Sequence, residues 1–382
     1  MTTGSAPFEV VIAGGGVGAL EGALALRDLA GDRVSITLIA PNADFVYRPA
    51  AVAEPFSFGR AQHYPLDDIA RDIGVQRVED VLRSVEPSKG TAHSGSGRAF
   101  RYDALLVTLG ARIHARYEHA TTIDDRRLDD QLHGLIQDVE GGYVKRVAFV
   151  VPPRMAWPLP IYELALMTAT RAYDMNEDVA ITVLTPEVAP LAIFGDGASS
   201  AVSALLAENQ IEVITSASCE IPAAGTIEAN PGGRTVHADR VIALPELEGP
   251  RVPGLPAADD GFIPIDLHSR IEGLEREFAA GDSTDFSIKH GGIAYQQADA
   301  AARAIAALAG AQVEPEPFDP TVQGVLLTGG KPRYLRAVIK GGRGVKSEFS
   351  DEPPSTPVAK ISAKYLAPYL DERDRAAGRG GW

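Results

Sequence analysis

The chain has 382 residues, a formal net charge of −15 at pH 7 and one cysteine, Cys219. The acidic balance disfavours nucleic acid as a partner, and the apolar runs end well short of the roughly 18 residues that span a membrane. One cysteine excludes an internal disulfide, a CxxC redox pair and a cysteine metal cluster, and we expect it to be a packing residue. The eight histidines are scattered, so we predict no metal site, and we expect a cytoplasmic enzyme of two or three domains.

Residues 8–40 have the pattern of a βαβ unit in a parallel sheet. A strand leads into the turn Gly14-Gly15-Gly16-Val17-Gly18-Ala19, and a helix and a second strand follow. Gly14 permits the tight turn, Gly16 lets the backbone approach a pyrophosphate, and Ala19 lets the helix pack closely on the strand. The N–H groups at the start of the helix then face the anion. We therefore predict a dinucleotide site at this turn.

Two further segments are expected to reach the same site. The second strand ends in Ala40-Pro41-Asn42, without the acid that usually binds the ribose. Ribose recognition is therefore expected from the backbone, from Asn42 or from elsewhere in the chain. A buried strand over residues 102–107 ends in Thr108-Leu109-Gly110-Ala111, which places more backbone close to the cofactor.

A second pattern follows late in the chain. A short apolar strand ends in Gly281-Asp282, and Lys289 and Gly292 stand at the start of a long alanine-rich helix. The two patterns in this order indicate FAD rather than NAD, with the glycine turn on the ADP half and Asp282 near the ribityl phosphate. The partial positive charge of the helix N-terminus, together with Lys289, would stabilise negative charge on the reduced flavin. The alternative for Lys289 is a solvated lysine before a helix.

Residues 144–214 repeat the βαβ rhythm without its glycines. Where a phosphate cradle would stand, the sequence is Pro152-Pro153-Arg154-Met155-Ala156-Trp157-Pro158-Leu159-Pro160. Proline has no N–H to donate, and the bulky side chains would block the approach of a pyrophosphate. We therefore predict that this second unit does not bind NAD(P) in the usual way.

The last part of the chain begins near residue 315. We predict a hairpin over residues 325–339, a loop rich in Gly, Pro and Ser, and a final helix. Six bases between Lys331 and Lys346 occur without an acid, so this stretch either faces solvent or meets an anionic membrane or an acidic protein. Apolar residues at helical spacing within 361–370 favour docking of the helix on protein over an interfacial membrane contact.

With these motifs the chain resembles the pyridine nucleotide-disulfide oxidoreductase superfamily, and within it the sulfide:quinone oxidoreductase and type II NADH:quinone dehydrogenase branch. The resemblance extends over residues 8–370. It is carried by residues 14–21, 45–49, 108–111, 157–165 and 279–298. It implies FAD bound between the first domain and the late Gly-Asp helix, with electrons passing from a donor to a quinone.

The resemblance also implies the residues of the site. Val81 would meet the adenine through its backbone, and Glu163 matches a glutamate that approaches the flavin in relatives. Proton transfer could involve Glu163, since burial would raise its pKa, and Lys289 would balance the charge; a surface helix acid is the alternative for Glu163. The cofactor-binding residues are Gly14, Gly16, Val17, Ala19, Ala40, Pro41, Arg48, Val81, Thr108, Gly110, Gly281, Asp282, Lys289 and Gly292.

The chain departs from the family pattern at both usual electron-donor sites. Sulfide oxidation in that family uses a cysteine pair beside the flavin, and this chain has no cysteine near Trp157 or Lys289. The NADH-oxidising relatives need an intact second glycine motif, and prolines stand there instead. A cysteine-dependent sulfide mechanism is therefore not expected.

The predicted fold is α/β, with two Rossmann-like three-layer domains and a small C-terminal α+β region. We assign the FAD-binding domain to residues 1–118 and 251–314, the second Rossmann-like domain to 119–250, and the C-terminal region to 315–382. The predicted function is an FAD-dependent oxidoreductase that passes electrons from an unidentified small-molecule donor to a quinone or similar acceptor. The alternatives are an NAD(P)H dehydrogenase with an atypical nicotinamide site and a flavin-bound scaffold without catalysis. A homodimer, and a peripheral contact with the inner face of the membrane, are further expectations.

Overall fold

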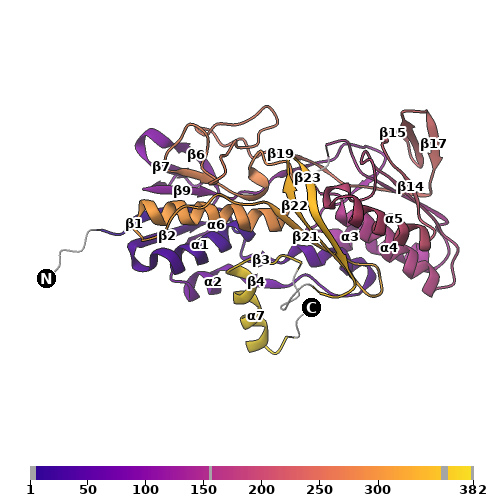
Figure 1. Ribbon diagram of the computed structural model, residues 1–382, viewed down its shortest axis with the longest axis horizontal. Coiled ribbons are helices and arrows are strands. Elements are labelled where there is room, and N and C mark those ends of the chain that lie inside the picture. The colour runs from indigo at the N-terminus through magenta and orange to yellow at the C-terminus, as the bar shows by residue number, and fades with distance from the viewer. Residues whose placement is uncertain (1–5, 155–156, 354–359, 380–382) are drawn as a thin grey trace.

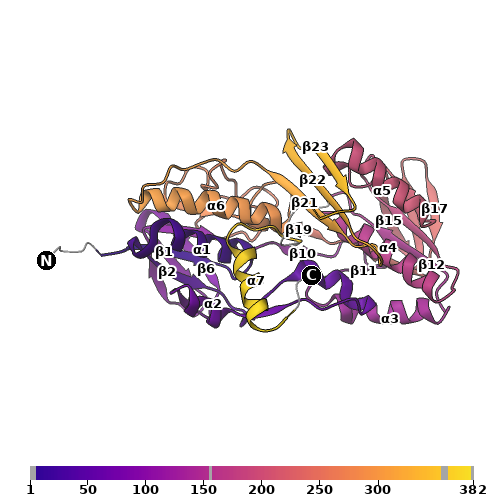
Figure 2. The same ribbon diagram turned by 60° about the horizontal axis from the view of Figure 1, so that its bottom comes forward.

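The computed structural model describes residues 6–154, 157–353 and 360–379. Two α/β domains lie side by side along the long axis of the molecule, and each is built on a five-stranded parallel sheet (Figure 1). The C-terminal sheet lies between the helices of the two domains (Figure 2). The predicted fold class is confirmed, because parallel neighbours in both sheets require the crossover helices that the two βαβ patterns indicated.

The sheet of the first domain has the strand order β20-β9-β1-β2-β5, and all neighbouring strands are parallel. β1 lies in the middle because its residues 10–13 are apolar and buried on both faces of the sheet. β20 comes from late in the chain and joins the edge of this sheet beside β9. The strands are β1 (Phe8–Ala13), β2 (Val34–Ile39), β5 (Gln76–Val78), β9 (Ala104–Val107) and β20 (Glu277–Ala279).

Helices α1 (Val17–Ala30) and α6 (Gly291–Leu308) pack together on one face of this sheet (Figure 1). Gly22 permits the close approach of α1 to the sheet, because a Cβ there would lie 2.7 Å from the side chain of Leu106. A small antiparallel sheet packs on the other face through Val85, Ala92 and Tyr102. It consists of β6 (Leu82–Glu86), β7 (Thr91–Ser94) and β8 (Ala99–Arg101).

The sheet of the second domain has the order β11-β18-β12-β13-β14, again with parallel neighbours. Cys219 is fully buried in an attached antiparallel sheet, which confirms its predicted packing role. The parallel strands are β11 (Thr121–Thr122), β12 (Arg146–Val150), β13 (Ala180–Leu184), β14 (Glu212–Ile214) and β18 (Arg240–Ala243). The helices are α3 (Leu128–Glu140), α4 (Leu159–Asp174) and α5 (Asp196–Glu208). The antiparallel strands are β15 (Ser218–Ala223), β16 (Thr226–Asn230) and β17 (Arg234–His237).

Short elements complete the two domains. The antiparallel pair β10–β19 forms where the chain passes from one domain to the other and back. The remaining strands and the short α-helix are β3 (Asp44–Val46), β4 (His63–Pro65), α2 (Leu66–Asp72), β10 (Arg112–His114) and β19 (Glu246–Glu248). The 3-10 helices are η1 (Gly31–Arg33), η2 (Arg48–Phe56), η3 (Pro87–Lys89), η4 (Ala192–Phe194) and η5 (Gly281–Ser283).

The C-terminal sheet has one strand more than predicted. It consists of β21 (Thr321–Leu326), β22 (Arg333–Lys340) and β23 (Arg343–Ser350), so the loop expected after residue 339 is wrong over 343–350. Gly341 and Gly342 both have positive φ, 56° and 75°, which suits the tight hairpin turn between β22 and β23. The pair of glycines therefore starts a hairpin and not an irregular loop.

Acids that follow the basic stretch neutralise part of it. Arg336 pairs with Glu348 across β22 and β23, and Arg333 pairs with Asp351, each at 3.4 Å. Exposed pairs of this kind contribute little stability, but they lower the net charge that the stretch presents. None of the described helices has the length and apolar character needed to cross a membrane.

Helix α7 (Leu366–Ala376) docks on the first domain through a buried acid. The carboxylate of Glu21 in α1 accepts the backbone N–H groups of Lys364, Tyr365 and Leu366, at 2.8, 3.1 and 2.7 Å. These donors lie at the N-terminus of α7, where N–H groups have no partner within the helix. Leu366 and Leu370 are buried in the core of the first domain. The helix therefore packs on protein, as its apolar spacing predicted.

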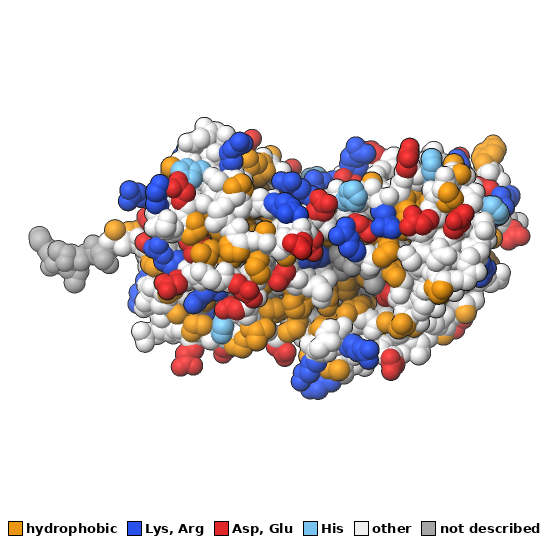
Figure 3. Space-filling model, turned by 90° about the horizontal axis from the view of Figure 1, so that it is seen from above, with side chains coloured by type: hydrophobic (Ala, Val, Ile, Leu, Met, Phe, Trp, Pro, Cys, Tyr) orange, Lys and Arg blue, Asp and Glu red, His pale blue; other side chains and the backbone are white. Residues whose placement is uncertain are grey.

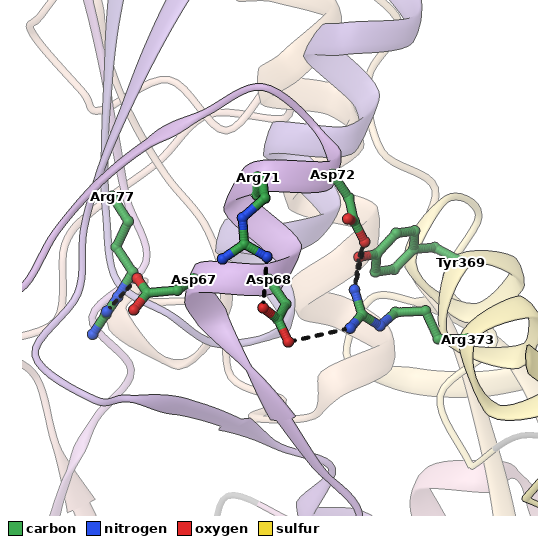
Figure 4. A network of polar contacts seen from close by, with 7 residues as sticks. All are labelled: Asp67, Asp68, Arg71, Asp72, Arg77, Tyr369 and Arg373. Atoms are coloured by element: carbon green, nitrogen blue, oxygen red, sulfur yellow. Dashed lines mark hydrogen bonds and ion pairs between the residues drawn. The ribbon is translucent and has the colours of Figure 1, made fainter. Parts of the chain in front are cut away.

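A second set of contacts holds the exposed side of α7 (Figure 4). The carboxylate of Asp72 in α2 accepts a hydrogen bond from the hydroxyl of Tyr369 at 2.8 Å and pairs with Arg373. Arg373 also forms an ion pair with Asp68 at 3.7 Å. α7 is thus fixed to α1 on its buried side and to α2 on its exposed side.

Glu21→Gln is expected to remove part of the pH dependence of folding. Burial raises the pKa of Glu21 from its ordinary value of 4.5 to about 7. An acid with a raised folded-state pKa contributes stability that is fully present below pH 4.5 and lost as the pH rises through 7. Urea unfolding should therefore show the native protein losing about 3 kcal/mol more than the variant between pH 4 and pH 8. Equal losses in the two proteins would contradict this role.

Candidate functional site

The glycine turn after β1 leaves space at its tip. Gly14 has a φ of +131°, and a Cβ there would lie 2.3 Å from the carbonyl oxygen of Thr108. A Cβ at Gly16 would meet no described atom within 4 Å. Helix α1 starts at the next residue, Val17, and no side chain caps it. The first N–H groups of α1 are therefore open to an anionic ligand.

The ends of β2 and β9 frame this turn. The N–H and the hydroxyl of Thr108 both donate to the carbonyl of Ala13, at 2.7 and 3.0 Å. Gly110, with a φ of +72°, turns the chain away from the sheet. Ala40 is buried and donates its N–H to the end of β5 at 3.0 Å, whereas Pro41 is exposed. The structure thus brings Ala40, Thr108 and the glycine turn together at the carboxyl ends of neighbouring parallel strands.

A cavity of about 610 Å³ opens beside Gly110. It also includes Val81, the predicted adenine contact, whose residue surface is 47% exposed. The N–H of Val81 donates to the carboxylate of Asp80 and its carbonyl accepts from Gly95, so its backbone groups already have partners. Any contact of Val81 with a planar ring would therefore use its side chain. The cavity is lined by residues 81–84, 109–112 and 250–253.

Gly281 and Asp282 follow β20, at the same carboxyl ends of the parallel strands. A Cβ on Gly281 would lie 3.1 Å from the Cβ of Ala294, so the first turns of α6 pack tightly on this segment. The carboxylate of Asp282 has no hydrogen-bond or ion-pair partner among the described residues. Burial raises the pKa of Asp282, and the charge of Lys289 counteracts this. A partly buried carboxylate of this kind is suited to ligand hydroxyl groups.

Lys289 lies buried beside this carboxylate. Its ammonium donates to the carbonyl of Thr284 and lies 3.6 Å from the centre of the Phe262 ring. Burial lowers the pKa of Lys289 to about 8, and Asp282 opposes that effect. Lys289 therefore keeps its positive charge at neutral pH. Arg48, another predicted cofactor residue, instead forms an ion pair with Asp125 at 3.5 Å.

A histidine caps the start of α6. The Nδ1 atom of His290 accepts the N–H of Gly292 at 3.0 Å, so this N–H, expected at the cofactor, already has a partner. The imidazole lies against Trp157, with ring centres 4.4 Å apart and an interplanar angle of 34°. Sequence reasoning did not single out His290. The pattern that could have revealed it is a polar residue directly before Gly-Gly at a helix start.

Glu163 forms a buried ion pair with Lys360, which lies 197 residues further along the chain. Its carboxylate accepts from the ammonium of Lys360 at 2.7 Å and from the N–H of Leu327 at 3.0 Å. Burial raises the pKa of Glu163, as expected from the sequence, but Lys360 opposes the change. The positive charge of Lys360 also lowers the pKa of His290, so this pair lies close to the start of α6. Glu163 is buried, which excludes the surface-acid alternative.

Residues 155–156 of the turn after β12 lie outside the described residues, but the acid after β13 is hydrogen-bonded within the second domain. Tyr162 donates its hydroxyl to Glu187 at 2.6 Å, and Thr185 donates to the same oxygen at 3.1 Å. Glu187 follows β13, the position at which a dinucleotide domain carries the acid for a ribose. All three side chains are buried, and burial raises the pKa of Glu187 to about 7. The carboxylate of Glu187 therefore accepts hydrogen bonds from side chains within the second domain.

No family model matches the sequence. A sulfide-quinone reductase from Aquifex aeolicus (strain VF5) is 26% identical over 258 residues, which cover 64% of this chain and 60% of that protein. The chain thus spans about three-fifths of the length of that relative. This similarity confirms the resemblance to the sulfide:quinone oxidoreductase branch that the motifs indicated.

Solved structures share the fold over most of the chain. The sulfide:quinone oxidoreductase from Aquifex aeolicus has a TM-score of 0.79 at 20% identity, covering 97% of this chain and 91% of that one. A ferredoxin reductase from Rhodopseudomonas palustris has a TM-score of 0.65 at 19% identity, covering 87% and 83%. A NAD-dependent persulfide reductase from A. fulgidus has a TM-score of 0.62 at 19% identity, covering 87% and 64%. At these identities the likeness shows the fold.

Glu163→Gln is expected to lower the free energy of unfolding by about 3–5 kcal/mol, because Lys360 then stays buried without a counter-ion. Adding Lys360→Met should recover most of that loss, since the double variant buries no unpaired charge. Urea unfolding of the parent protein, of the Glu163→Gln and Lys360→Met variants and of the double variant measures the coupling between the two residues. Losses that simply add would contradict a shared role. Turnover that stays low in the stable double variant would point to a proton-transfer role for Glu163 as well.

Proposed function

We propose that the chain is an FAD-dependent oxidoreductase that passes electrons from a small-molecule donor to a quinone or similar acceptor. The proposal rests on two features that lie together at the carboxyl ends of the parallel strands of the first domain. One is the uncapped N-terminus of α1 beside Gly16, and the other is the unpartnered carboxylate of Asp282. The similarity to a protein named sulfide-quinone reductase supports a quinone as the acceptor.

The residues at these strand ends fit FAD. The N–H groups beside Gly16 and Val17 would hold the pyrophosphate, and Asp282 would accept ribityl hydroxyls. The cavity that contains Val81 and Gly110 has room for a planar base. When bound, FAD supplies transfer of one or two electrons between donor and acceptor, and the protein supplies position and charge.

The charged groups near α6 then have separate tasks. Lys289, with a pKa of about 8, retains its proton at neutral pH and holds a fixed positive charge next to Asp282. Together with the partial charge at the start of α6, it would favour negative charge on the cofactor. Glu163 would act as a proton carrier only while Lys360 remains its partner, because the ammonium favours the carboxylate form.

The donor is proposed to be neither NAD(P)H nor sulfide. Tyr162 and Thr185 occupy the carboxylate of Glu187, and prolines stand in the turn that would hold a pyrophosphate. Cys219 is buried in the small antiparallel sheet of the second domain, and burial raises the pKa of its thiol to about 11. A single thiol of this kind is a poor nucleophile. These features support a different small molecule as the electron donor.

Gly16→Ala is expected to weaken FAD binding and to leave the apoprotein stable. The added methyl group meets no described atom within 4 Å, so the unfolding free energy of the apoprotein should change by less than about 0.5 kcal/mol. The same methyl group stands where a pyrophosphate would approach. FAD content after gel filtration and the melting temperature of the apoprotein separate the two effects. Undiminished FAD content in Gly16→Ala would be evidence against this placement. The comparison variant Gly14→Ala places its Cβ against Thr108, so it should lose both FAD binding and stability of the apoprotein.

Anaerobic mixing with NADH or NADPH is expected to leave the flavin absorbance band unchanged, because the acid after β13 is buried and hydrogen-bonded by Tyr162 and prolines stand in the turn after β12. Photoreduced protein should instead transfer electrons to menadione, seen as return of the oxidised flavin band. Rapid bleaching by NADH would favour the NAD(P)H dehydrogenase alternative. A photoreduced flavin that is never reoxidised by quinones would favour the scaffold alternative.

A further inference from the structure

Trp157 and His290 form an aromatic pair at the junction of the two domains. Trp157 precedes α4 of the second domain, and His290 precedes α6 of the first. Their ring centres lie 4.4 Å apart, and Trp157 also contacts Phe194 edge to face at 5.5 Å. Both Trp157 and His290 are half-buried and keep some accessible surface. Figure 3 shows hydrophobic side chains gathered on this face near the middle of the molecule.

The helix cap fixes the tautomer of His290. Because Nδ1 accepts the N–H of Gly292, the neutral ring carries its proton on Nε2. Burial, with the nearby charge of Lys360, lowers the pKa of the ring to about 4, so the imidazole is neutral at pH 7. Nε2–H has no partner among the described residues, and it is not among the fully buried atoms without a partner. Among the described residues it is therefore a hydrogen-bond donor left free for a ligand.

The surroundings of this donor carry little free charge. The ammonium of Lys360 is the nearby cation, and the carboxylate of Glu163 pairs with it at 2.7 Å. An uncharged ligand loses less solvation than an anion on entering such a place. The aromatic faces of Trp157 and Phe194 favour a planar ring. Together, these features select a flat, uncharged molecule with one hydrogen-bond-accepting oxygen.

We propose that Nε2–H of His290 and the ring of Trp157 bind the carbonyl oxygen and the ring plane of a quinone-like molecule. This inference rests on the proposed function and adds the residues that recognise that substrate class. His290 is then a binding residue that also caps α6.

His290→Asn tests the donor while it preserves the cap. An asparagine at this position can still accept the Gly292 N–H, since Asn is among the best N-cap residues, but it is too short to replace Nε2–H. Menadione is the probe, and the holoprotein with Trp382→Phe makes Trp157 the remaining tryptophan of the two in the chain. Quenching of tryptophan fluorescence gives the Kd. The matched control is His237→Asn, an exposed histidine on β17.

We expect saturable quenching in the parent protein, a Kd that rises about 3- to 10-fold in His290→Asn, and no change in His237→Asn. The concentration of menadione that half-saturates reoxidation of the photoreduced protein should rise by a similar factor, while reoxidation by ferricyanide, which offers no carbonyl group, stays unchanged. Quenching that does not saturate, or an equal Kd in the parent and in His290→Asn, would overturn the inference. If menadione binds as expected but photoreduced protein reduces neither acceptor, the proposed function fails and the binding site stands.

Discussion

The packing of α1 against α6 is the contact on which the candidate site depends. The glycine turn stands at the start of α1, and Gly281-Asp282 packs under the first turns of α6, so the two motifs meet because the two helices lie together. Small residues line this contact: a single Cβ added at Gly18 would already be in van der Waals contact with the carbonyl of Ala294, at 3.6 Å. Larger side chains here would separate the anion-binding helix end from the carboxylate.

Two buried acids fix the C-terminal segment, residues 360–376, to the two domains. Glu21 binds the backbone at the start of α7, and Glu163 binds the side chain of Lys360 a few residues earlier. The first acid belongs to α1 and the second to α4, so the segment connects both domains. Burying charge is costly, and such pairs are weak evidence for net stability. Their effect is to fix one position for the segment beside His290.

The sequence was informative where function needs a local pattern, and less so where distant residues meet. The turn at Gly14 and the Gly281-Asp282 pair could be found because their spacing follows from cofactor and backbone geometry. The partner of Glu163 could not, since Lys360 is 197 residues away and no periodicity marks it. Strand β23 was missed because the glycines before it also suit a loop. The cap at His290 was overlooked although its local pattern was present.

The second domain has the architecture of a dinucleotide fold but lacks two features that usually hold the ligand. Its parallel sheet needs only apolar strands and covering helices, and these remain. The ligand needs an open helix N-terminus and a free acid, and here Pro158 precedes α4 while Tyr162 occupies Glu187. The hydroxyl groups of Tyr162 and Thr185 thus occupy one oxygen of this carboxylate, and its other oxygen is buried without a partner among the described residues. Burial raises the pKa of Glu187 to about 7, so much of this acid is protonated at neutral pH and the fold tolerates it in the core.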